Sequence, residues 1–134
     1  MTVTYTIYYN GVQLDTKSGT MNVTTFVPDV KIQSVTLPTN AKKRPASETI
    51  WVTTYTTILT LINSESVDVT VHWQAHSSAT GDFDQGDVTV PRNGSVTVTK
   101  AYYYTTAGTW NIDYSISYAG NRVDSWSGTM IVSP

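Results

Sequence analysis

Residues 110–118 read WNIDYSISY, and this stretch decides the fold class because apolar and polar side chains alternate along it. One face of the extended chain would carry only large side chains: Trp110, Ile112, Tyr114, Ile116 and Tyr118. The other face would carry Asn, Asp and Ser. A period of two is typical of a strand with one buried and one solvated face. The stretch therefore predicts a half-buried strand in an antiparallel sheet.

The same period recurs through most of the chain, whereas no stretch shows a convincing helical period. It predicts further strands at residues 30–37, 50–62, 67–75, 87–90, 96–104 and 123–132. Turn-forming residues separate these strands at short spacing, and the longest expected loops are residues 38–47 and 77–86. Seven strands from residue 29 onward predict an all-β fold, an antiparallel immunoglobulin-like β-sandwich with Trp73 buried between its sheets.

The last predicted hairpin has a second copy at the start of the chain. Residues 5–23 read YTIYYNGVQLDTKSGTMNV and residues 114–132 read YSISYAGNRVDSWSGTMIV, with ten of nineteen positions identical and no gaps. The offset of 109 residues (114 − 5) is about the length of one sandwich domain. We therefore expect an extra N-terminal hairpin in residues 1–28 and a sandwich in residues 29–134, together forming one compact unit.

An isolated hairpin is marginally stable in water, so its apolar face has to be covered. Three arrangements satisfy this need. The hairpin could be the tail of a preceding module in a tandem array, or it could join its own sandwich as a nine-stranded domain. Alternatively, it could complete a neighbouring subunit and build a head-to-tail polymer. The high effective concentration of an intramolecular contact favours the second arrangement.

The duplicated element also supplies candidate contact residues. Tyr5, Ile7 and Tyr9 match apolar residues of the C-terminal hairpin, and we expect them at an interface. We also expect Trp126 at an interface, because its counterpart in the first copy is Lys17. A position that accepts both Trp and Lys is expected to be exposed in at least one copy.

Composition excludes several classes of protein. The 134 residues include no Cys, so neither disulfides nor thiolate metal sites stabilise the chain. A net charge of −2 argues against nucleic acid as a partner, because phosphate binding needs a concentrated Lys/Arg face. No apolar run approaches the roughly 18 residues that would insert into a membrane. A chain with only 13% charged residues is what we associate with extracellular, cell-surface or virion proteins.

Two clusters could bind a ligand. The sequence GDFDQGD at residues 81–87 gathers Asp82, Asp84 and Asp87 on an expected flexible loop, which suits a possible calcium ion. The alternative is a polar loop without a metal. Tyr102, Tyr103 and Tyr104 must send at least one ring outward, so they could form an aromatic platform for sugars or a protein. The alternative is that these rings fill the core.

The sequence shows no arrangement of residues that would support catalysis. No nucleophile elbow is present, and no pair of carboxylates stands out as a glycosidase would need. We therefore predict that the protein is not an enzyme and has no cofactor, apart from the possible calcium.

Three segments resemble the immunoglobulin-like modules of the CARDB (cell-adhesion-related domain) type. They read TILTLINSESVDVTVHWQA (57–75), GDVTVPRNGSVTVTK (86–100) and TTAGTWNIDYSISYAG (105–120), so the resemblance covers about residues 50–120. It implies a non-catalytic surface or adhesion module that often occurs in tandem. We predict a structural module of an extracellular filament, surface layer or virion appendage that associates with itself or with adjacent modules. The alternative function is binding of carbohydrate or a cell surface.

Overall fold

The structure is a computed structural model that describes residues 2–20, 26–47 and 52–134. Within these ranges the chain forms nine strands, none of its segments is helical, and no helix long and apolar enough to cross a membrane is found. The strands are β1 (Thr2–Tyr9), β2 (Val12–Thr20), β3 (Val30–Thr36), β4 (Tyr55–Asn63), β5 (Val69–Ser77), β6 (Gly81–Val90), β7 (Gly94–Tyr102), β8 (Gly108–Tyr118) and β9 (Asn121–Val132).

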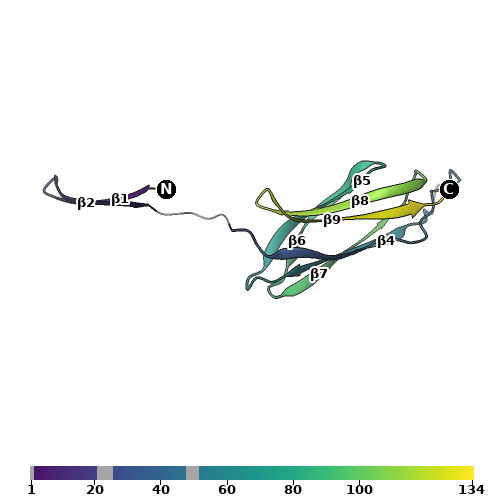
Figure 1. The fold of residues 1–134 in the computed structure, drawn as a ribbon, viewed down its shortest axis with the longest axis horizontal. Coiled ribbons are helices and arrows are strands. Elements are labelled where there is room, and N and C mark those ends of the chain that lie inside the picture. Colours follow the sequence, from purple (N-terminus) through teal and green to yellow (C-terminus); the bar gives the residue numbers. More distant parts are fainter. Residues whose placement is uncertain (1, 21–25, 48–51) are drawn as a thin grey trace.

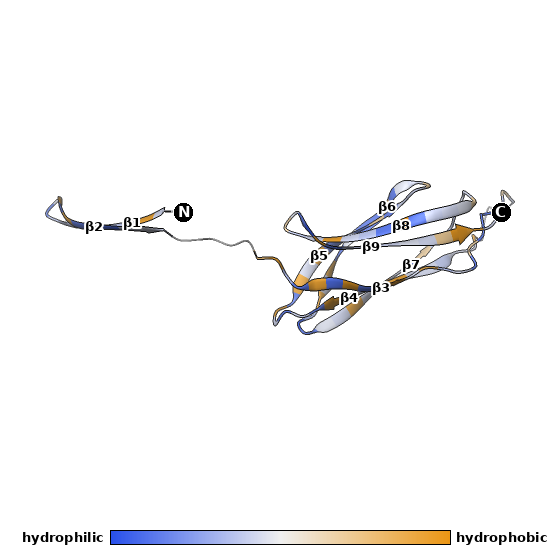
Figure 2. Ribbon diagram, in the orientation of Figure 1, coloured by the Kyte–Doolittle hydropathy of each residue, from blue (hydrophilic) through white to orange (hydrophobic). Residues whose placement is uncertain are grey.

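Strands β3 to β9 form a two-layer sandwich (Figure 1). One sheet has the order β3-β4-β7 and the other the order β6-β5-β8-β9, and all neighbours are antiparallel. The predicted immunoglobulin-like sandwich of seven strands with an extra N-terminal hairpin is confirmed. Strands of both sheets carry hydrophobic residues (Figure 2), and the buried core includes Leu59 and Leu61 from one sheet and Trp73 and Ile116 from the other.

Strand β6 is longer than expected, and the predicted loop at residues 77–86 is wrong. The turn is confined to the residues around Thr80, whose amide and hydroxyl both bond to the Ser77 hydroxyl. From Gly81 onward the chain pairs with β5. The sequence was misleading because this strand has a solvated outer face, which tolerates the polar residues that otherwise indicate a loop. The predicted start of β4 at residue 50 lies outside the described residues.

Two polar contacts connect separate strands of the sandwich. Buried Asn63 donates from Nδ2 to the carbonyls of Val67 (2.9 Å) and Val90 (3.0 Å), and its Oδ1 accepts from the Glu65 amide. The Asp124 carboxylate on β9 accepts from the Ile32 amide on β3 at 2.9 Å, which links the edges of the two sheets. Neither of these contacts, and none of the described residues of the buried core, belongs to β1 or β2.

Strands β1 and β2 form a two-stranded sheet of their own, drawn apart from the sandwich (Figure 1). Tyr5 is 74% exposed and Ile7 is 59% exposed. The arrangement differs from the compact nine-stranded unit, which stays a prediction for the chain in solution.

Deletion of residues 1–25 should leave the stability of the sandwich unchanged to within about 0.5 kcal/mol, because the buried core runs from Val30 to Val132. Urea unfolding of the full and shortened chains, followed by tryptophan fluorescence, measures the difference. A loss of several kcal/mol would instead show that the hairpin packs on its own sandwich.

Candidate functional site

The N-terminal hairpin is the candidate functional site because it reproduces the β8–β9 hairpin in structure as well as in sequence. Tyr5 faces Lys17 across the strands, as Tyr114 faces Trp126. The register shifts between residues 7 and 8 in the first copy and between residues 116 and 117 in the second, at positions 109 apart. The bulge, which re-aims the side chains beyond it, is thus also duplicated.

The turns of the two hairpins match as well. Asn10 and Gly11 have φ values of 49° and 76°, and Ala119 and Gly120 have values of 50° and 82°. Positive φ at both central residues is the requirement of a type I′ turn, which suits the twist of the flanking strands. Each copy therefore carries the local signals for the same hairpin, independent of what covers it.

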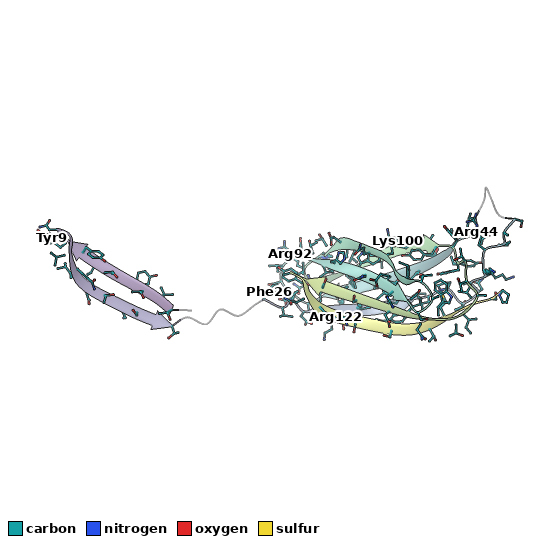
Figure 3. The ribbon with its side chains drawn as sticks, turned by 90° about the horizontal axis from the view of Figure 1, so that it is seen from above. Tyr9, Phe26, Arg44, Arg92, Lys100 and Arg122 are labelled. Atoms are coloured by element: carbon teal, nitrogen blue, oxygen red, sulfur yellow. The ribbon has the colours of Figure 1, made fainter. Side chains whose placement is uncertain are left out.

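Corresponding apolar side chains are buried in the second copy of the hairpin and exposed in the first. Tyr114 is 3% exposed and Ile116 is fully buried, whereas their counterparts Tyr5 and Ile7 are exposed. Six of the twelve large apolar side chains that are exposed in the described residues lie between Tyr5 and Leu14, so uncovered apolar surface concentrates on this hairpin. Tyr9, at its tip, is also exposed (Figure 3). The expected interface residues Tyr5, Ile7 and Tyr9 are thus free to contact a partner.

Trp126 is held within the sandwich. Its ring packs on Tyr114 with centroids 6.3 Å apart and lies over Gly128, where an added methyl group would meet the ring atom Cζ2 at 2.8 Å. It is one of the partly buried residues around the core, so its role at an interface stays a prediction.

The first copy lacks this ring because Lys17 replaces Trp126. A methyl group added at Gly19 would meet nothing within 4 Å, and a hollow of about 350 Å³ lies above this position. Its lining is Val3, Tyr5, Lys17, Ser18, Gly19 and Thr20. We call this feature the Gly19 hollow. The sequence signal for it is the exchange of Trp for Lys next to a glycine that both copies keep.

The three consecutive tyrosines do not form an exposed platform. Tyr104 is buried and packs edge-on against Trp110 at 5.1 Å. Tyr102 is partly buried, and its hydroxyl donates to Asp84 at 2.5 Å. Only Tyr103 is exposed, with the Arg44 guanidinium 5.2 Å from its ring centroid. The side chains therefore separate into core and surface positions, as alternation along an extended chain requires.

The three carboxylates proposed for calcium have different partners. Asp82 bonds to His76 at 2.8 Å, Asp87 bonds to His72 at 2.9 Å, and Asp84 accepts from Tyr102. Among the described residues, no group of three His, Cys, Asp or Glu side chains could hold a metal ion. The calcium site thus receives no support from the geometry and stays a prediction.

Comparison with known proteins identifies the fold. No sequence family and no curated protein sequence matches the chain. The NMR structure of the CARDB domain of a Pyrococcus furiosus protein matches with a TM-score of 0.59 and 10% identity, covering 78% of this chain and 92% of that domain. This chain shares the CARDB fold. The crystal structure of the same domain, in complex with di-metal ions, matches with a TM-score of 0.57 and 12% identity over 82% of this chain and all of that one.

A larger protein contains a similar module. A Bacteroides fragilis chain assigned as a β-galactosidase matches with a TM-score of 0.56 and 10% identity, over 77% of this chain but only 17% of its own length. At these identities the comparisons show the fold alone. They confirm the resemblance to CARDB modules, and the function has to be argued from this chain's own residues.

The buried tyrosines predict how stability depends on pH. Burial raises the pKa of Tyr102 far above the ordinary value of 10.0, and its hydrogen bond to Asp84 raises it further. Burial likewise raises the pKa of Tyr114. These hydroxyls ionise first in the unfolded chain, so stability that is present below pH 10 is lost as the pH rises above it.

Tyr102→Phe should therefore weaken the decline in the free energy of unfolding above about pH 10. Urea midpoints measured on both sides of that pH check this expectation. Tyr103→Phe, which changes the exposed neighbour, is the matched control. Equal pH dependence of the two variants would contradict the role assigned to Tyr102.

Proposed function

We propose that the chain is a non-enzymatic structural module of an extracellular filament, surface layer or virion appendage, and that it acts by self-association through the β1–β2 hairpin. The observation that supports this proposal is the exposure of Tyr5 and Ile7, whose counterparts are buried in the core. A hairpin with this sequence is one that the fold normally covers. Its exposed apolar side chains would therefore be stabilised by a partner that buries them.

The free energy gained by burying apolar area favours a protein surface as the partner. An exposed apolar patch on a folded protein marks an interaction site when its residues are contiguous, which these are. Burial of apolar area is the main favourable term in association, and aromatic side chains contribute most to it. On this face the hairpin offers the rings of Tyr5 and Tyr9 for this purpose. A second copy of the chain is the simplest partner because it supplies the same kind of surface.

The two histidines of the chain are paired with carboxylates. His72 and His76 lie on the solvated face of the sheet, and each bonds to an aspartate on the neighbouring strand. No Ser or Thr hydroxyl is described as hydrogen-bonded to either histidine, so a nucleophile–base pair is not among the described contacts. The CARDB fold adds support for a surface or adhesion-related module, in keeping with an extracellular or virion location.

A second candidate function is adhesion to a carbohydrate. A groove of about 340 Å³ runs over the outer face of the four-stranded sheet, and its lining includes Gln74, His76, Asp82, Asp113, Ser115 and Arg122. Such hydrogen-bonding groups suit a polyhydroxylated ligand. Polysaccharide binding that survives deletion of residues 1–25 and is lost in His76→Ala would favour this candidate.

The proposed self-association predicts that Tyr5→Asp with Ile7→Asp keeps a folded sandwich and abolishes assembly. Two charges on the apolar face cannot be buried without a large desolvation cost. Light scattering and negative-stain microscopy across protein concentration provide the measurement. The control is Thr4→Asp with Thr6→Asp, which adds the same charges on the opposite face of β1. Equal assembly by both variants, or a chain that is monomeric at every concentration, would overturn the proposal.

A further inference from the structure

The Gly19 hollow lies at the base of the hairpin, on the face that is buried in the second copy. Its lining includes two cross-strand pairs, Val3 with Gly19 and Tyr5 with Lys17. In the β8–β9 hairpin, the ring of Trp126 occupies the corresponding space above Gly128. The first copy thus keeps the space for an aromatic ring but does not supply the ring.

We infer that the Gly19 hollow binds the Tyr9 side chain of a second copy, so that two hairpins pack face to face. This inference rests on the proposed self-association and names its partner. An aromatic ring in the hollow would lie against the ring of Tyr5. Aromatic rings in contact favour edge-to-face or offset packing. The Lys17 ammonium would lie beside the incoming ring and attract its π face.

The symmetry of the hairpin allows both hollows to be filled at once. Val3 and Tyr9 lie three residues on either side of Thr6, so an antiparallel pair with its two-fold axis near Thr6 places each Tyr9 over the other copy's Val3. Val3 pairs with Gly19, so the Tyr9 ring reaches the hollow. A two-fold contact of this kind is self-complementary, because residue i meets j and residue j meets i.

The hairpin is also the richest source of exposed rings in the described residues. It presents Tyr5, Tyr8 and Tyr9, whereas the only large exposed rings described elsewhere are Phe26 and Tyr103. Phe26 packs edge-on against Tyr118 at 5.8 Å, and Tyr103 lies against Arg44. The two rings outside the hairpin thus already have partners. A pair of hairpins closes on itself, so this contact by itself forms a dimer.

Filling the hollow tests the inference in the full chain. Gly19 has no positive φ and a methyl group added there meets nothing within 4 Å, so Gly19→Leu should keep the hairpin while blocking the partner's ring. Lys17→Trp should act in the same way, because it restores the ring that β9 carries. Each change should weaken dimerisation by about tenfold or more, measured by sedimentation equilibrium. Thr16→Leu, on the opposite face of β2 and outside the lining of the hollow, is the matched control and should leave dimerisation intact.

A mixing experiment identifies the surface that the hairpin binds. A tagged chain that lacks residues 1–25 retains the complete sandwich core, and it should fail to capture the full chain. Capture would overturn the hairpin pair, because the hairpin would then bind a sandwich. Unchanged association of both Gly19→Leu and Lys17→Trp would overturn the hollow as the contact while leaving self-association through the hairpin in place. A full chain that is monomeric at every concentration would overturn both.

Discussion

The apolar face of a β-hairpin has to be covered, and the whole arrangement of this protein depends on that constraint. In the β8–β9 hairpin, Tyr114 and Ile116 meet the interior of the sandwich and are buried. Two antiparallel layers, each solvated on one side, are the stable way to cover such faces. The β1–β2 hairpin has the same register, bulge and turn but no second layer among the described contacts. The same type of hairpin is therefore part of the core at one end of the sequence and leaves its apolar face exposed at the other.

Exchange of hairpins between molecules does not remove this requirement. Among the described residues, the edge of β5 and the facing β3 hold one hairpin of this type, whereas the chain carries two copies of the hairpin. If the N-terminal hairpin of one copy displaced the C-terminal hairpin of another, one hairpin per chain would still be uncovered. Net burial needs an additional surface, and a second uncovered hairpin provides one of matching character.

The sequence was sufficient to predict the sandwich because its strands alternate cleanly around Trp73 and Ile116. It failed for residues 77–86, where Asp, Gln and Gly occur in a strand whose outer face is wet. The sequence also could not show which of the tyrosines at 102–104 are buried and which are exposed. Alternation places them on opposite faces, but only the position of the facing sheet shows that Tyr104 packs against Trp110. Carboxylates close in sequence likewise acquired different partners, since the bulge opposite His76 changes which side chains share a face.

The Gly19 hollow marks the position where the two hairpins differ by one large side chain, Trp126 in one and Lys17 in the other. Both copies keep a glycine at this position, although only Gly128 lies under a ring that requires it. At Gly19 a side chain would be tolerated within the isolated hairpin, and β-propensity would favour one. A glycine that its own molecule does not require is explained if a ring from another molecule lies above it. The exchange of Trp126 for Lys17 then converts a self-filled face into one that a second copy completes.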